Sequence, residues 1–229
     1  VLDLYNGQLL CTGWFNQTAN TEFAELFVLN LTNGQLVQAA KFTAHYDSQI
    51  YDTAVINDLK RRFIYLVGVD NGSKGLFVSI GYHGSFAAKK NACFIGPTDA
   101  SITQIFAITV LPNNGHLIAG TYSRAGQIGG DTMFVAHLSV NEDQSPIPLP
   151  SVVKSLGLRF GGEDKRVHRI VKQNDKWWIT GFLTTSIRPF VVCLDQSLNI
   201  EWVRILQTDN KAVLSDAEFF DNNTLVFCG

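Results

Sequence analysis

The sequence predicts an all-β protein: a β-propeller of four-stranded antiparallel blades with about 54 residues per repeat. A Phe-Val dipeptide recurs at nearly even spacing, and an apolar run ending in glycine precedes each copy. Charged residues make up 17% of the chain, against about 25% in an average domain, which fits sheets covered on both faces. The repeated positions are Phe27-Val28, Phe77-Val78, Phe134-Val135 and Phe190-Val191, preceded by Gly13, Gly68, Gly120 and Gly181, with a fifth run ending at Gly229.

A period of this length indicates an array of one supersecondary unit. An open β-solenoid is the alternative architecture, but solenoid repeats are usually shorter, which favours the propeller. Propeller blades taper toward the ring axis. We therefore expect the four repeated glycines to lie near that axis, where a side chain would clash.

The fourth copy shows the strands most clearly. Apolar or β-branched runs cover residues 177–182, 189–194, 199–206 and 213–220, separated by polar breaks and turns. Four short strands per repeat, bounded by Gly, Asn, Asp and Ser, are typical of an antiparallel meander. Helix is therefore expected to be nearly absent.

The earlier copies follow the same plan. In the first, runs over 26–31 and 35–42 flank Asn33-Gly34, a strong signal for a two-residue hairpin. In the second, runs over 75–81 and 85–94 flank a Tyr-His-Gly turn. The third copy is interrupted by Pro146, Pro148 and Pro150, so we expect its blade to be the least regular.

The two ends of the chain carry partial repeats. Residues 1–5 have the form of a fourth strand, and residues 225–229 have that of a first strand. The expected architecture is four complete blades plus flanking strands of a fifth. No linker signal occurs, so we expect a single β-propeller domain over residues 1–229 that forms part of a longer propeller.

Three segments resemble a known repeat: PFVVCLDQSLNIEWVRIL from Pro189, DTMFVAHL from Asp131 and GLFVSIGYHG from Gly75. They are similar to bacterial β-propeller repeat (SBBP-like) proteins, whose consensus runs roughly G-G-x-D-A-F-V-A-K-L-D-x-x-G-x-L-x-W. The resemblance extends over all four copies as a pattern of apolar positions and turns. It implies a propeller fold and no particular activity.

The sequence contains few signs of chemistry. It has no G-x-S-x-G elbow, no P-loop and no H-E-x-x-H motif, and its cysteine spacing is unlike that of a metal site. No catalytic residue, metal or cofactor is therefore predicted. The four cysteines (Cys11, Cys93, Cys193 and Cys228) are expected to be buried free thiols, although Cys11 and Cys228 would become neighbours if the first and last strands met.

Charge and sequons bear on partners and location. The net charge of −2, without a basic cluster, argues against nucleic-acid binding, and no membrane span is predicted. Four N-x-S/T sequons favour a secreted or cell-surface protein. They begin at Asn16, Asn30, Asn71 and Asn222.

Loop length predicts which face of the propeller ring carries the binding residues. The longer, polar links cover residues 16–25, 70–74, 123–131, 43–49, 95–103 and 155–166. In a meander these links emerge on one side of the ring, and long loops on a rigid scaffold commonly carry binding residues. The candidate binding residues are Trp14, Asn16, His45, Tyr46, Asp47, Tyr122, Arg124, Arg159 and Asp164.

Three functions fit this pattern. A non-catalytic scaffold for protein interaction or adhesion is favoured, because no chemistry is visible. A carbohydrate-binding propeller is the alternative, with Trp14, Tyr46, Tyr122 and Asn16 as its candidates. A funnel-site enzyme, such as a lyase or hydrolase, comes third, because the strands expected at the channel carry few carboxylates or histidines.

Overall fold

The computed structural model describes residues 2–4, 7–18, 21–42, 48–57, 62–71, 73–82, 86–96, 99–111, 115–127, 130–139, 152–158, 160–207, 212–213, 216–221 and 224–228. These residues form strands β1 to β18 and no helix, so the all-β prediction is confirmed. Accordingly, none of the described segments is a helix with the length and apolarity to cross a membrane.

Four antiparallel sheets follow one another along the chain, each a meander of four consecutive strands. Sheet 1 contains β1 (Leu2–Leu4), β2 (Gln8–Thr18), β3 (Thr21–Asn30) and β4 (Leu36–Phe42). Sheet 2 contains β5 (Gln49–Asn57), β6 (Arg62–Asp70), β7 (Lys74–Tyr82) and β8 (Phe86–Phe94). Sheet 3 contains β9 (Ile102–Val110), β10 (Gly115–Ser123), β11 (Thr132–Ser139) and β12 (Val152–Ser155). Sheet 4 contains β13 (Lys165–Gln173), β14 (Lys176–Leu183), β15 (Arg188–Leu194) and β16 (Ile200–Ile205). A final pair joins β17 (Asp216–Phe219) to β18 (Leu225–Cys228).

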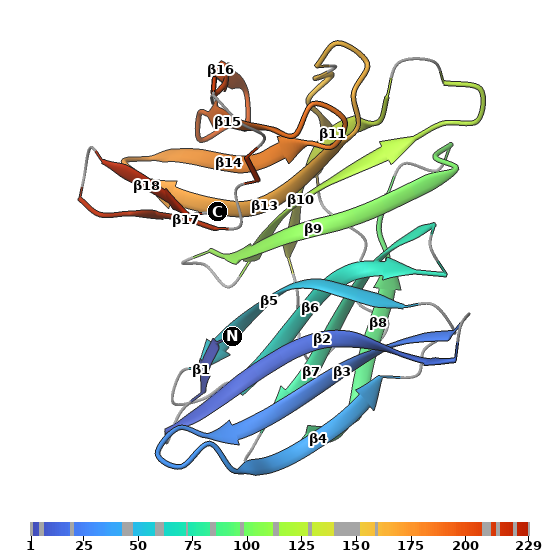
Figure 1. Cartoon of the computed structure of the whole chain (residues 1–229), viewed down its shortest axis with the longest axis vertical. Coiled ribbons are helices and arrows are strands. Elements are labelled where there is room, and N and C mark those ends of the chain that lie inside the picture. Colours follow the sequence, from blue (N-terminus) through green and yellow to red (C-terminus); the bar gives the residue numbers. More distant parts are fainter. Residues whose placement is uncertain are drawn as a thin grey trace.

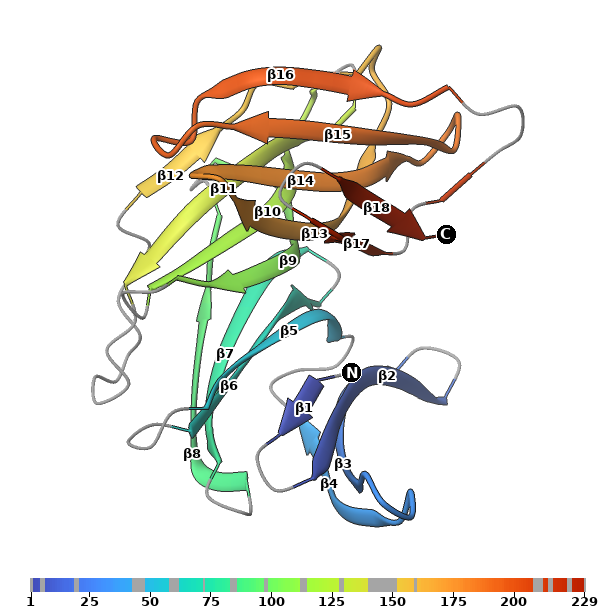
Figure 2. The same ribbon diagram turned by 90° about the vertical axis from the view of Figure 1, so that its left-hand side faces the viewer.

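The first strands of the sheets form a row. Strand β9 contacts both β5 and β13, and β13 also contacts β17. Figure 1 shows sheets 1 and 2 in one half of the molecule and sheets 3 and 4 with the β17–β18 pair in the other. In the turned view of Figure 2 the strands of this row succeed one another from β5 through β9 and β13 to β17.

Each of the four sheets has four strands, as expected for a blade, but begins one strand earlier in the sequence than the predicted repeat. The run expected to close one repeat instead begins the next sheet. The run 213–220, expected to close the fourth copy, contains β17, which pairs with β18, and in the same way β13 pairs with β14, the first run of the fourth copy. The link between them is Asn174-Asp175, where φ is 51° and 60°. Two residues at positive φ form a tight hairpin, so this short link pairs neighbouring strands. Residues 225–228 accordingly pair with β17 rather than flanking a blade alone.

Of the six longer links expected, 43–49, 95–103 and 155–166 cross between sheets, whereas 70–74 and 123–131 connect strands of one sheet. The expected link 16–25 is mostly strand, because β2 extends to Thr18 and β3 begins at Thr21.

The Phe-Val dipeptides all lie on the third strand of a sheet, but their registers differ. Phe134 and Phe190 each stand opposite the glycine of the second strand. In sheet 2 Leu76 takes that place, and Phe77 is displaced by one residue. A shift of one residue turns a side chain to the other face of the sheet. The dipeptides therefore mark equivalent strands but not equivalent positions.

Apolar side chains fill the space between successive sheets. Val78 and Leu66 belong to the cluster between sheets 1 and 2. Phe77 from β7 and Phe134 from β11 belong to the cluster between sheets 2 and 3, and Phe190 packs between sheets 3 and 4. Each of these three rings is fully buried.

Two other expectations fare differently. The three prolines of the third copy lie outside the described residues, and β12, which follows them, has 4 residues.

Among the cysteines, Cys193 is a buried free thiol as expected, whereas Cys11 is half-buried and Cys228 is exposed. Burial comes first among the causes that raise the pKa of the Cys193 thiol to about 11.

Candidate binding site

A β-bulge recurs in the first strands of sheets 2, 3 and 4. In each, one residue lacks a partner on the second strand, next to the pair that contains the repeated glycine. The unpaired residues are Tyr51, Phe106 and His168. A bulge bends its strand and redirects the side chain of the extra residue.

The bulges explain three of the glycines. A Cβ on Gly68, Gly120 or Gly181 would overlap a backbone carbonyl oxygen of the bulged strand. The oxygens belong to Gln49, Gln104 and Arg166, respectively. A Cβ on Gly13 would meet nothing within 4 Å, since the described part of β1 pairs only with residues 8–10. The expected crowding is therefore wrong for Gly13, and at the other three it comes from the adjacent bulge.

Two of the bulged residues form an aromatic pair across sheets. The rings of Tyr51 and Phe106 stack with centroids 5.0 Å apart. The guanidinium carbon of Arg166, on β13, lies 5.1 Å from the Tyr51 centroid and 5.8 Å from that of Phe106. Three sheets thus contribute to one cation–π cluster, an arrangement that holds the guanidinium in place.

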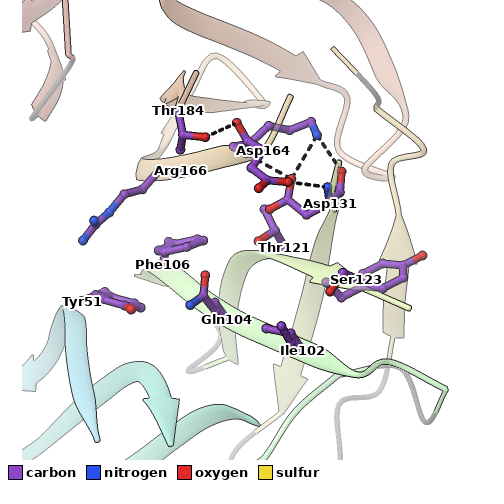
Figure 3. Close-up of a pocket in the computed structure, with 12 residues that line it drawn as sticks. Tyr51, Ile102, Gln104, Phe106, Thr121, Ser123, Asp131, Asp164, Arg166 and Thr184 are labelled. Atoms are coloured by element: carbon purple, nitrogen blue, oxygen red, sulfur yellow. Dashed lines mark hydrogen bonds and ion pairs between the residues drawn. The ribbon is translucent and has the colours of Figure 1, made fainter. Parts of the chain in front are cut away.

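This cluster borders a cavity of about 370 Å³. The cavity opens where β9 and β13 begin and β10 ends, the side on which residues 95–101, 124–131 and 156–164 join the strands. Strand β11 ends and β12 begins at the opposite end, with twelve residues of the sequence between them. Figure 3 shows Phe106 and Gln104 on one wall, with Asp131, Asp164 and Thr184 across from them. Tyr122 and Ile102 add apolar lining.

A buried lysine holds the far wall together. Lys165 is 2% exposed, and its Nζ donates to the carbonyl oxygen of Asp131 at 2.6 Å, to Asp131 Oδ1 at 3.1 Å and to the carbonyl oxygen of Glu163 at 2.9 Å. These bonds occupy all three ammonium hydrogens. Lys165 therefore has a structural role, tying the residues before β11 to the start of β13.

The carboxylates nearby are also engaged. Burial raises the pKa of Asp131, while hydrogen bonding by Thr121 and the charge of Lys165 oppose that rise. Asp164 Oδ1 accepts the backbone N–H of Asp131 at 2.9 Å. Thr184 donates its hydroxyl to the carbonyl oxygen of Asp164 at 3.2 Å. The wall is thus a connected network rather than a set of free reactive groups.

Unlike Lys165 and the carboxylates of this wall, Arg166 contributes no side-chain hydrogen bond to the network of described residues. Its side chain extends away from Asp164 and toward Tyr51 (Figure 3). Within the part of the chain that the structure describes, no carboxylate lies within ion-pair distance of its guanidinium. The side-chain amide of Gln104 likewise makes no hydrogen bond to a described residue. Among the described residues, therefore, the mouth of the cavity presents hydrogen-bond donors without a partner beside aromatic rings.

Three of the predicted binding residues are described with their side chains, and all three lie near this cavity. Tyr122 and Asp164 line it. Tyr122 is 3% exposed, and its hydroxyl lies 3.2 Å from Ser155 Oγ, so it is also part of the core. Arg124 is exposed, and its Nε donates to Asp99 Oδ2 at 2.5 Å.

The other six cannot be placed at a site. Trp14 and Asn16 lie on β2, but their side chains are not described. His45, Tyr46, Asp47 and Arg159 lie outside the described residues.

Sequence reasoning missed Tyr51, Phe106 and Arg166. A sequence pattern could have identified them. A polar residue, a β-branched residue and a residue with an aromatic side chain follow one another at residues 49–51, 104–106 and 166–168. Each triplet lies on the first strand of a sheet, opposite the glycine of the second. The signal is recognisable only once those strands are known to pair.

A second polar cluster lies on the first strands. Both oxygens of Asp52 accept backbone amides, from Ile108 at 2.9 Å and Thr53 at 2.8 Å, so this side chain ties sheet 2 to sheet 3. Burial raises the pKa of Asp52 to about 6, although the two amides and Arg169 oppose the rise. Arg169 Nε lies 3.5 Å from Asp216 Oδ1. Within the described residues, no group of histidine, cysteine and carboxylate side chains could hold a metal ion.

Comparison with known proteins adds no family. No protein-family model matches the chain, and no curated protein matches it.

Proposed function

We propose that the chain is a non-catalytic β-propeller scaffold that binds a protein partner at the cavity between sheets 3 and 4. The observation that carries this proposal is the position of the cavity, at the end of a rigid framework of sheets where three of the expected longer links (95–103, 123–131 and 155–166) join the strands. Four successive meanders with their first strands in a row support the propeller part. The resemblance to bacterial β-propeller repeat proteins agrees with it and belongs to the same proposal.

The chemistry of the cavity favours binding over catalysis. Its buried ammonium group is saturated by three acceptors, and the oxygen atoms of Asp131 and Asp164 serve the same network. Groups engaged in this way hold a surface in shape. Arginine and aromatic side chains on rigid supports are the groups that dominate protein recognition.

Carbohydrate binding is the second candidate. An aromatic ring beside the Gln104 amide and Asp164 is a combination that sugars use, and all of these residues line the cavity. However, the rings of Tyr51 and Phe106 already stack on each other and beside Arg166. A sugar would need an exposed ring face on which to stack, whereas a peptide can bind the guanidinium of Arg166 directly. The arrangement therefore favours a protein partner.

A sterically blocked variant tests the proposal. Thr184 is exposed at the cavity rim, so Thr184→Trp should close the mouth without disturbing the core. Gln196→Trp is the matched control, since Gln196 is exposed in the β15–β16 turn at the opposite end of sheet 4. Panning a random displayed peptide library should yield binders that Thr184→Trp loses and Gln196→Trp keeps. Failure to select any peptide from the library would contradict the proposal. Selective binding to a glycan array would favour the second candidate, carbohydrate binding.

Secretion or cell-surface exposure is part of the same proposal. Asn71 begins one of the sequons and lies in an exposed turn between β6 and β7, with φ of 49°. An exposed asparagine in a turn is accessible to glycosylation. Expression through a secretory pathway, followed by mass measurement before and after endoglycosidase, tests whether the site is used.

A further inference from the structure

We propose that the cavity recognises a carboxylate on an acidic peptide, and that Arg166 is the residue that binds it. This inference rests on the proposed function and names the chemistry of the partner. Arg166 is exposed at the cavity mouth, where no described carboxylate pairs with it. An arginine held in this way offers a planar fork of N–H donors to a carboxylate.

The aromatic pair makes this arginine suitable. Its guanidinium carbon is close to two ring centroids, at 5.1 Å and 5.8 Å. Contact with both rings restricts the side chain before a ligand arrives, so less conformational entropy is lost on binding. The rings also exclude water from one side of the guanidinium, which strengthens a bond to an anion on the other side.

The rest of the cavity selects among anions. Gln104 offers an amide donor on the same wall as Phe106. Asp164 is an exposed carboxylate on the other side, and it would repel a second negative charge. The positive charge of Lys165 does not offset this repulsion, because it is already paired with Asp131 Oδ1 at 3.1 Å. A single carboxylate therefore fits better than a phosphate group, which carries more charge.

The lining predicts the neighbours of that carboxylate. Ile102, Phe106 and Tyr122 contribute apolar surface inside a volume of about 370 Å³. This space is large enough for one apolar side chain next to the acidic residue. The preferred ligand is thus a peptide in which Glu or Asp adjoins an apolar residue.

Fluorescence anisotropy with labelled peptides tests the inference. The probes are hexapeptides with an acetylated N-terminus and an amidated C-terminus that contain one Glu beside Leu, and the same peptides with Gln in its place. The Glu peptides should bind at least about tenfold more tightly, the difference expected for a charge-assisted pair. Arg166→Gln should remove this preference. Arg166→Lys should remove most of it, because lysine keeps the charge and loses the planar fork.

Arg204→Gln is the matched control. Arg204 is also an exposed arginine over an aromatic ring, 5.5 Å from the Trp202 centroid, but it lies on β16 away from the cavity. This variant should bind like the parent protein. Equal binding of the Glu and Gln peptides, or full binding by Arg166→Gln, would overturn the inference. Competition by inorganic phosphate at concentrations where acetate has no effect would overturn it as well.

The two proposals can fail separately. If the displayed library yields binders that Thr184→Trp loses but that carry no acidic residue, the carboxylate inference fails and the binding function stands. If the library yields none while the Glu hexapeptides bind through Arg166, the cavity recognises carboxylates without a role in partner binding.

Discussion

Gly120 lies beside the bulge at Phe106, so that the carbonyl oxygen of Gln104 occupies the space a Cβ at position 120 would need. The ring of Phe134 closes the same space from the third strand. Gly68 and Gly181 repeat this relationship with the bulges of sheets 2 and 4. Glycine and bulge thus act as one unit that shapes the first strand of sheets 2, 3 and 4.

Substitution of these glycines should destabilise the fold. We expect Gly120→Ala and Gly181→Ala to lower the free energy of unfolding by about 1–3 kcal/mol, because backbone atoms must move. Gly13→Ala is the control and should change it by no more than about 0.5 kcal/mol, since its Cβ meets nothing. Urea denaturation measures all three. A loss at Gly13 as large as that at Gly120 would show that the bulge is not the cause.

The buried lysine and its ion pair give a second prediction. Lys165→Met should lower the free energy of unfolding by about 3–5 kcal/mol, because it leaves the largely buried carboxylate of Asp131 without its partner. The double variant Lys165→Met with Asp131→Asn should recover part of that loss. A double-mutant cycle from chemical denaturation gives the coupling between the two residues. Additive effects would argue against a network centred on Lys165.

Tyr122 connects the cavity to the core. Tyr122→Ala should lower the free energy of unfolding by about 3–5 kcal/mol, since the buried ring packs against Phe134. Tyr122→Phe keeps the ring and loses the hydroxyl contact with Ser155, so it should cost about 1 kcal/mol. Thermal or chemical unfolding compares the two. Equal losses in the two variants would show that the Tyr122 hydroxyl, rather than the packing of its ring, provides the stabilisation.

The pH dependence of stability should reflect two opposed groups. Asp52 has a pKa of about 6 in the folded chain, against an ordinary aspartate value of 3.8, so the folded protein binds more protons between these values. Stability from this group therefore falls as pH rises from about 4 to 6. Burial lowers the pKa of His116 to about 4 from 6.5. The unfolded chain then binds more protons, and stability from His116 rises over a similar range.

Single variants should separate the two contributions, each about 3 kcal/mol at most. Asp52→Asn keeps an acceptor for the Ile108 amide, and its stability should rise more steeply between pH 4 and 6 than that of the parent. His116→Leu should show the reverse, a fall over the same range. Denaturant midpoints at several pH values measure both slopes. Unchanged slopes in both variants would show that neither group titrates in this range.

The sequence by itself determined the strands and their order. Alternating apolar residues, Asn-Gly and similar turn signals, and the repeated glycines depend on neighbours a few residues away, so they are readable from the chain. The side of the sheets from which the longer loops leave was predictable for the same reason: strand direction alternates in a meander. Three of the expected longer links accordingly lie at the end of sheets 3 and 4 where the cavity opens, next to Tyr122 and Asp164 in its lining, although the twelve residues between β11 and β12 join those strands at the opposite end.

Only the tertiary structure decided which strands pair into one sheet and which residues meet between sheets. The Asn174-Asp175 hairpin joins two predicted repeats, and a one-residue shift separates Phe77 from its apparent counterpart in Phe134. Tyr51 and Arg166 are 115 positions apart in the sequence and touch because β5, β9 and β13 form a row. Local patterns cannot specify such contacts, since they depend on how bulged strands twist and pack against each other.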